Sequence, residues 1–252
     1  MQKSENHKSS NSRGAISVII PSLNEENGID KTINEIPREE LEKMGYTCEI
    51  LVVDGGSKDN TRENARNSGA RVIVEFRPGY GIAYKTGFAH ARGNIIVALD
   101  GDFSYPAFLI PRLVELLEEQ KLDFISTNRM RDFTNGSFSL FHLLGNKVLT
   151  YLVNFLFKVD IQDSQSGMWV FRKTVLGRVN LLANGMPFSE EIKILAFKLL
   201  KSKEISIPYR KRTGEKKLHT LIDGAKNLAY LFSLRFSLTN VARKLNLSEQ
   251  PF

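Results

Sequence analysis

Short apolar runs alternate with segments of helical periodicity along the chain. We expect strands at Ile16–Ile20, Glu49–Val53, Arg71–Glu75, Ile95–Leu99 and Asp123–Ser126, and a later one at Met168–Phe171. Helices are expected near Glu25–Glu35, Asn60–Ser68, Ile82–Ala91, Pro106–Gln120, Phe138–Phe157, Glu190–Leu200 and Leu218–Leu234. Because strand and helix alternate in this way in right-handed β-α-β units, the pattern predicts an α/β fold with a doubly wound, mostly parallel sheet.

Polar residues follow three of the expected strands, at the point where each strand ends. Asn24 and Glu25 follow the first strand, Asp54 follows the second, and Asp100-Gly-Asp102 follows Ile95–Leu99. In an open parallel sheet, ligands bind at this edge. Two carboxylates placed there suit Mg²⁺ or Mn²⁺, which take few protein oxygens and complete their shells with water or phosphate. An isolated Asp-x-Asp also fits a simple strand end or helix cap.

Composition favours one domain with an anionic partner. The 252 residues, 42% of them apolar, suffice for one large core, which we expect at 15–235, with tails at 1–14 and 236–252. Cys48 is the single cysteine, which excludes an internal disulfide and fits a reducing, cytoplasmic setting. The net charge of +7 favours a nucleotide, a lipid phosphate or an acidic membrane face as partner.

Five ordered motifs resemble family 2 of the inverting glycosyltransferases, which use nucleotide sugars and have the GT-A fold. They are Pro21-Ser-Leu-Asn24-Glu25, Asp54-Gly-Gly-Ser57-Lys-Asp59, Gly79-Tyr-Gly81, Asp100-Gly-Asp102 and Asp163-Ser-Gln165-Ser166-Gly167. The resemblance extends from about residue 15 to about residue 231 and therefore covers most of the chain.

The resemblance implies a role for each matching position. Asp102 is the expected direct ligand of Mg²⁺ or Mn²⁺, and Asp100 is expected to hold the ribose or the sugar. The other expected donor-binding residues are Pro21, Asn24, Glu25, Asp54, Ser57 and Gly81. Two positions depart from the family pattern: Ser104 stands where a second metal contact is commonly Gln, and Trp169 stands where Arg is commoner.

A cationic segment, Arg210-Lys-Arg212-Thr-Gly214-Glu-Lys216-Lys217, suggests the acceptor. It resembles an element of the dolichol-phosphate-mannose-synthase-like branch, whose enzymes act on polyprenyl phosphates. Arg and Lys neutralise phosphate, and Gly214 suggests a turn that brings Arg212 and Lys217 onto one anion. The residues expected to hold the acceptor are Arg129, Gln165, Ser166, Arg212 and Lys217. The expected partners are therefore a nucleotide sugar and a dolichyl or undecaprenyl phosphate.

The acceptor decides whether a general base is needed. A phosphate acceptor is already anionic near neutral pH and needs none, whereas a sugar hydroxyl would need a carboxylate to take its proton. Glu190 and Glu191 are the candidates for that base, and the resemblance favours Glu191 near the site. Both residues also fit the start of the helix Glu190–Leu200, where acidic side chains are favourable. The sequence leaves these alternatives open.

The segment Phe138–Phe157 predicts either membrane contact or a core helix. His142, Asn146, Thr150 and Asn154 recur at every fourth position and form a polar stripe on an otherwise apolar helix. Such a helix lies in a membrane interface or packs as core with a satisfied polar seam. The cationic segment favours the interface, and we expect a peripheral protein at the cytoplasmic face of a membrane.

Two other classes of function fit the sequence less well. A nucleotide-dependent oxidoreductase would need a third glycine after Gly79-x-Gly81, but Tyr84 stands there, and no acidic residue follows at a strand end about 20 positions on. A basic module that binds nucleic acid or membranes without catalysis would need no carboxylates at strand ends. We therefore expect no nucleic-acid partner.

Overall fold

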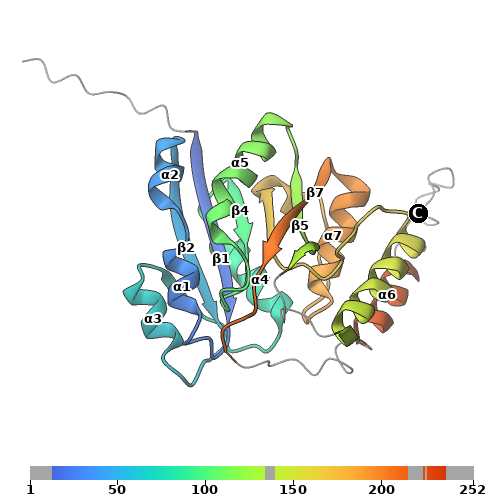
Figure 1. The fold of residues 1–252 in the computed structure, drawn as a ribbon, viewed down its shortest axis with the longest axis horizontal. Coiled ribbons are helices and arrows are strands. Elements are labelled where there is room, and N and C mark those ends of the chain that lie inside the picture. The colour runs from blue at the N-terminus through green and yellow to red at the C-terminus, as the bar shows by residue number, and fades with distance from the viewer. Residues whose placement is uncertain (1–12, 134–139, 215–223, 225, 237–252) are drawn as a thin grey trace, which may run out of the picture.

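The computed structural model describes residues 13–133, 140–214, 224 and 226–236. Within these residues it contains a sheet of order β3-β2-β1-β4-β6-β5-β7 with helices on both faces (Figure 1). The strands are β1 (Gly14–Ser22), β2 (Tyr46–Asp54), β3 (Arg71–Val74), β4 (Ile95–Ala98), β5 (Phe124–Phe133), β6 (Trp169–Arg172) and β7 (Ser202–Tyr209). β6 runs antiparallel to β4 and β5, and the other strand pairs are parallel. The expected α/β fold with a mostly parallel sheet is confirmed.

The helices occupy most of the expected segments. They are α1 (Ile29–Asn34), α2 (Arg38–Lys43), α3 (Thr61–Asn67), α4 (Tyr80–His90), α5 (Ile110–Glu119), α6 (Leu140–Phe157) and α7 (Phe188–Leu199), with 3₁₀ turns at Ala107–Leu109 and Lys173–Gly177. Residues 226–236 are also helical. The sequence analysis missed α2 and β7. Gly14, which was expected in the N-terminal tail, belongs to β1. The predicted boundaries of the domain and its tails otherwise stay predictions.

Both faces of the sheet are buried, which explains the continuous apolar runs of its central strands. Val18 and Ile20 on β1 point into one core with side chains of α1, α2, α3 and α5. Ile19 points to the opposite face, into a second core with α4 and α7. The period-two alternation of a strand thus places the two helix layers on either side.

Close backbone contacts hold the loops at the carboxyl edge of the sheet. A Cβ at Gly28 would lie 2.9 Å from the carbonyl oxygen of Gly101, so only glycine lets the start of α1 approach the turn at Asp102. In that turn Phe103 has a left-handed φ of 62°. These contacts fix the turn that presents Asp102.

The polar stripe of α6 faces inward. Asn146 and Thr150 are buried, and Asn154 exchanges hydrogen bonds with the backbone of Ile161. The outward stripe is apolar and consists of Leu144, Val148, Tyr151 and Phe155, each at least half exposed. The side chain of His142 lies outside the described residues. In the described part of the chain, no helix combines the length and apolarity that a membrane span requires.

Candidate active site at the carboxyl edge of the sheet

A cavity of about 440 Å³ opens at the carboxyl ends of β1, β2 and β4. Seven of the residues expected at the site line it: Pro21, Glu25, Asp100, Asp102, Arg129, Gln165 and Arg212. Its lining does not include Asn24, Asp54, Ser57, Gly81, Ser104 or Glu191, while Lys217 lies outside the described residues. The fold therefore brings together side chains from positions 21 to 212.

Asp102 is held in one orientation by its neighbour Ser104. The Asp102 Oδ1 atom accepts hydrogen bonds from the backbone N–H of Ser104 at 3.0 Å and from its hydroxyl at 2.5 Å. The other oxygen, Oδ2, contacts Arg212 Nη2 at 2.9 Å. Ser104 is fully buried, so it acts on the cavity through Asp102.

Asp100 stands beside Asp102 in an environment that disfavours its charge. Tyr80 donates a hydrogen bond from its hydroxyl to Asp100 Oδ1 at 3.1 Å. Burial, together with the charge of Asp102, raises the pKa of Asp100 to about 7. A Cβ at Gly167 would lie 3.1 Å from Asp100 Oδ2, so glycine lets the 163–167 loop close against this carboxylate.

Asp54, Ser57 and Asn24 form the frame behind one end of the cavity. Asp54 Oδ1 accepts hydrogen bonds from the backbone N–H groups of Gly56 and Ser57. The Ser57 hydroxyl in turn accepts the backbone N–H of Asn24, which joins the loops after β1 and β2. Asp54 Oδ2 is buried and has no hydrogen-bond partner within the described residues. A buried acceptor of this kind is suited to a donor group on a ligand.

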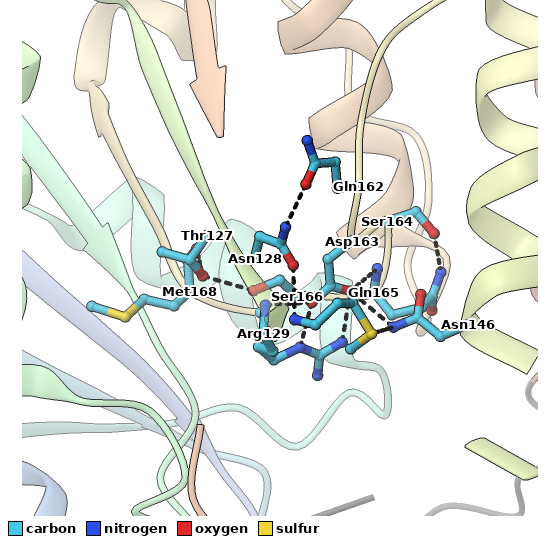
Figure 2. Close-up of polar contacts among 12 residues, drawn as sticks. Thr127, Asn128, Arg129, Asn146, Gln162, Asp163, Ser164, Gln165, Ser166 and Met168 are labelled. Carbon is cyan, nitrogen blue, oxygen red and sulfur yellow. Dashed lines mark hydrogen bonds and ion pairs between the residues drawn. The ribbon is translucent and has the colours of Figure 1, made fainter. Parts of the chain in front are cut away.

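A buried ion pair contributes Arg129 to the cavity wall. Arg129 on β5 donates to both carboxylate oxygens of Asp163, at 2.7 and 2.9 Å (Figure 2). Asn146 on α6 donates to the same carboxylate at 2.9 Å. Arg129 holds the pKa of Asp163 well below its usual range. The buried Lys193 on α7 donates to the backbone oxygens of Asp163 and Ser166. The 163–167 loop is thus fixed from β5, α6 and α7.

Gln165 connects the cavity to α7 and to the helix at 226–236. Its amide nitrogen donates to the Ser164 hydroxyl at 2.9 Å and to Glu190, and its oxygen accepts from Asn227 at 3.2 Å. Glu190 is fully buried, and burial raises its pKa to about 7. The Ser166 hydroxyl shares a hydrogen bond with the Thr127 hydroxyl inside the sheet. Of the two neighbours Gln165 and Ser166, both expected to hold the acceptor, Gln165 lines the cavity and Ser166 does not.

Glu191 and Gly81 stabilise contacts between α7, α4 and the loop at Leu182 and Ala183. The Glu191 carboxylate accepts the backbone N–H groups of Leu182 and Ala183 and the hydroxyl of Tyr230, at 2.7 to 2.9 Å. A Cβ at Gly81 would lie 2.6 Å from the Ala183 oxygen, so glycine permits α4 to pack against this loop. The carboxylate of Glu191 therefore accepts its hydrogen bonds outside the cavity lining, and its role as a base stays a prediction.

The sequence analysis missed further residues that line the cavity. Glu75 and Arg77 follow β3, and the Arg77 guanidinium pairs with Glu75 at 2.7 Å. The rule applied to the other strand ends could have found them, since Glu75 is the last residue of the expected strand and Arg77 follows it closely. Tyr80 and Tyr209 also line the cavity, but their pattern is that of ordinary core aromatics.

The donor set fits a divalent cation that is completed by phosphate. Asp102 lines the cavity, and its Oδ1 atom is fixed by Ser104. No group of three or more His, Cys, Asp or Glu ligands occurs in the part of the chain that the structure describes. Mg²⁺ and Mn²⁺ sites with one or two carboxylates commonly take their other ligands from water and substrate phosphates.

Comparison with family models shows where the chain belongs. Residues 17–179 match the model described as glycosyl transferase family 2. The chain is 30% identical over 212 residues to the dolichyl-phosphate hexose transferase of Haloferax volcanii, covering 83% of this chain and 89% of that protein. It is 33% identical over 219 residues to the low-salt glycan biosynthesis hexosyltransferase Agl6 of the same organism, covering 86% of this chain. It is 29% identical to the dolichol-phosphate mannosyltransferase of Pyrococcus furiosus, covering 81% of this chain. The chain spans 52% of Agl6 and 59% of the Pyrococcus protein.

The fold agrees with solved structures of a glycosyltransferase. Glucosyl-3-phosphoglycerate synthase from Mycobacterium tuberculosis, in complex with phosphoglyceric acid, superposes with a TM-score of 0.71 at 24% identity, covering 88% of this chain and 80% of that one. The same enzyme has been solved with Mn²⁺, uridine diphosphate and glucosyl-3-phosphoglycerate, and that structure gives a TM-score of 0.68 with the same coverage.

Proposed function

The chain belongs to glycosyl transferase family 2, and we propose that it transfers a hexose from a nucleotide diphosphate sugar to a polyprenyl phosphate, with inversion at the anomeric carbon. The proposed donor is GDP-mannose or a UDP-hexose, and the proposed acceptor is a dolichyl or undecaprenyl phosphate. The carrying observation is the convergence of Asp100, Asp102, Arg129 and Arg212 on one cavity.

The donor half of the proposal rests on the carboxylates at the strand ends. A bound Mg²⁺ or Mn²⁺ at Asp102 would supply positive charge to the leaving diphosphate. Asp100 is proposed to hold the ribose or the sugar. Pro21 and Glu25 line the cavity on the side of β1, and Asp54, outside the lining, has a buried carboxylate oxygen with no hydrogen-bond partner within the described residues. This side is the proposed nucleoside pocket.

The acceptor half rests on the cationic side chain of Arg129. The reaction forms a bond from an acceptor phosphate oxygen to the anomeric carbon while the bond to the leaving diphosphate breaks with its electron pair. Arg129 lines the cavity and is fixed by Asp163, so it offers a positioned positive charge. Because a phosphate acceptor is already anionic, no side chain has to remove a proton. The engagement of Glu191 with backbone amides supports an acceptor of this type.

Membrane contact is proposed through α6 and the helix at 226–236. The two helices pack together through Val153, Phe157, Leu231 and Leu234 and lie beside each other in Figure 1. Each also carries exposed apolar residues at helical spacing: Leu144, Val148, Tyr151 and Phe155 on α6, and Leu228, Phe232 and Phe236 on the other helix. Exposed apolar stripes of this kind are favourable in a membrane interface, where a lipid acceptor resides. The cytoplasmic side stays a prediction.

A donor screen tests the proposal. Radiolabelled GDP-mannose, UDP-glucose and UDP-galactose are each offered with undecaprenyl or dolichyl phosphate and Mg²⁺ or Mn²⁺. We expect label in the lipid extract from one donor, loss of that label in excess EDTA, and no label when the free polyprenol replaces its phosphate. Transfer to a sugar hydroxyl with no transfer to any lipid phosphate would overturn the proposed acceptor.

A further inference from the structure

Arg212 occupies the place where the proposed cation would contact the protein. Its Nη2 atom lies 2.9 Å from Asp102 Oδ2 and 3.6 Å from Glu25 Oε1. Asp102 Oδ1 already accepts two hydrogen bonds from Ser104, so Oδ2 is the oxygen better suited to bind a cation. A cation that binds this oxygen must approach to about 2.0–2.2 Å, and the guanidinium stands in the way.

The backbone on both sides of Arg212 is fixed to the same turn. The N–H and the hydroxyl of Thr213 both donate to the backbone oxygen of Asp102 at 2.9 Å. The N–H of Arg210 donates to the backbone oxygen of Ser104 at 3.1 Å, and the Arg210 guanidinium pairs with Glu35. Arg212 can therefore leave Asp102 by a side-chain rotation while its backbone remains attached.

The guanidinium of Arg212 is only partly satisfied where it lies. Its Nε–H is buried and has no acceptor within the described residues. A planar guanidinium can donate to phosphate through two parallel N–H groups. Arg212 contacts a single oxygen of Asp102 and therefore does not use this bidentate geometry. The diphosphate of a nucleotide sugar would offer acceptors for these N–H groups, and it would enter the same cavity.

We propose that Arg212 is the counter-ion of Asp102 whenever metal and nucleotide are not bound, and that the cation and the nucleotide diphosphate must displace it together. The inference rests on the proposed function, since it assumes a nucleotide diphosphate donor. A divalent cation alone would face the positive charge of Arg212 a few ångströms away. A diphosphate that arrives with the cation neutralises both charges and accepts the hydrogen bonds of the released guanidinium. Arg212 thereby couples metal binding to donor binding.

Metal binding to the nucleotide-free enzyme tests this inference without turnover. The affinity for Mn²⁺ is measured by electron paramagnetic resonance and by calorimetry for the wild type and for Arg212→Gln. We expect Arg212→Gln to bind Mn²⁺ at least tenfold more tightly than the wild type. With saturating UDP or GDP, after correction for Mn²⁺ held by free nucleotide, the wild type should gain much more Mn²⁺ affinity than Arg212→Gln does. Linkage requires Mn²⁺ to strengthen nucleotide binding by the same factor.

Two control variants separate this role from general charge and from folding. Lys211→Gln removes one positive charge from the exposed neighbour of Arg212 and should leave Mn²⁺ affinity unchanged. Arg212→Lys keeps the charge and should bind Mn²⁺ as weakly as the wild type. Cooperative thermal unfolding of each variant shows that it is folded.

The outcomes distinguish the inference from the function on which it rests. Equal Mn²⁺ affinities of wild type and Arg212→Gln without nucleotide would overturn the inference and leave the proposed function standing. Equal tightening in Lys211→Gln would also overturn it, because net charge would then explain the effect. If neither UDP nor GDP binds to the wild type with Mn²⁺, the proposed donor chemistry is wrong.

Discussion

The side chains of Arg129 and Asp163 form a buried bidentate ion pair, with N–O distances of 2.7 and 2.9 Å. Asn146 donates to the same carboxylate, and Lys193 lies against the backbone of this loop. Because Arg129 lines the cavity and Asp163 begins the 163–167 loop, this pair supports both the cavity wall and the fold.

The first prediction concerns the stability that this ion pair provides. Asp163→Asn leaves the Arg129 charge buried without its counter-charge, and we expect a loss of about 3–5 kcal/mol in the free energy of unfolding. Urea unfolding at pH 7 measures it. The control is Glu115→Gln, which breaks the solvent-exposed pair with Arg112 and should cost less than about 1 kcal/mol. Losses of similar size in the two variants would contradict the prediction.

The second prediction separates the metal carboxylate from the packing carboxylate. Asp102→Asn should lower kcat at least about a hundredfold, because the charge that holds the cation at the leaving diphosphate is lost. Glu191→Gln, compared at a temperature at which both variants stay folded, should lower kcat much less, since its carboxylate bonds to backbone amides. A Glu191→Gln enzyme that binds both substrates but does not turn over would revive the hydroxyl acceptor.

The third prediction tests the exposed apolar stripe of α6. We expect the wild type to sediment with anionic vesicles, Phe155→Glu to bind them more weakly, and Leu144→Glu with Phe155→Glu to remain in the supernatant. Phe108→Glu, which changes an exposed aromatic side chain beside α5 in the same way, is the control and should sediment like the wild type. If the Phe155→Glu protein binds vesicles as the wild type does, membrane contact through α6 is excluded.

The fourth prediction is a pH dependence of stability at Glu190. Burial raises its pKa to about 7, whereas the unfolded value is about 4.3. Between these two pKa values the folded protein keeps a proton on Glu190 that the unfolded chain has released. The free energy of unfolding is therefore highest with respect to this group below about pH 4, and it falls as the pH rises towards 7. Glu190→Gln removes the titration. Relative to the wild type, its free energy of unfolding should therefore be higher at pH 8 than at pH 5, by on the order of 2 kcal/mol. An unchanged difference between the two pH values would refute the assignment.

The fifth prediction compares two helical glycines. Gly81→Ala places a Cβ 2.6 Å from the Ala183 oxygen and 2.9 Å from Phe188 Cβ, and we expect it to destabilise the protein. Gly145→Ala on α6 meets no atom within 4 Å and should stabilise by up to about 1 kcal/mol, because alanine restricts the unfolded chain. Thermal unfolding of both variants measures the contrast. Equal effects would show that the contact at Gly81 is relieved at no cost.

The sequence by itself determined the layout of the sheet edge. Apolar runs identify strands that are buried on both faces, and the polar residues after β1, β2 and β4 must emerge at one edge whenever those strands are parallel. Asp100 and Asp102 could therefore be placed in a cavity from local pattern alone. α2 and β7 were missed. α2 is short, and most residues of β7 are at least partly exposed, so neither segment gives a strong periodic signal.

Only the tertiary structure decided which way each polar side chain turns and what it meets. The stripe of Asn146 and Thr150 is visible in the sequence, but its inward direction depends on the distant Asp163 and Ser164, which offer it partners. Glu190 and Glu191 are adjacent and chemically identical, yet Glu190 meets Gln165 while Glu191 meets backbone amides. Arg212 reaches Asp102 across 110 positions of sequence. Contacts of this kind are set by packing between segments far apart in the chain, which local periodicity does not encode.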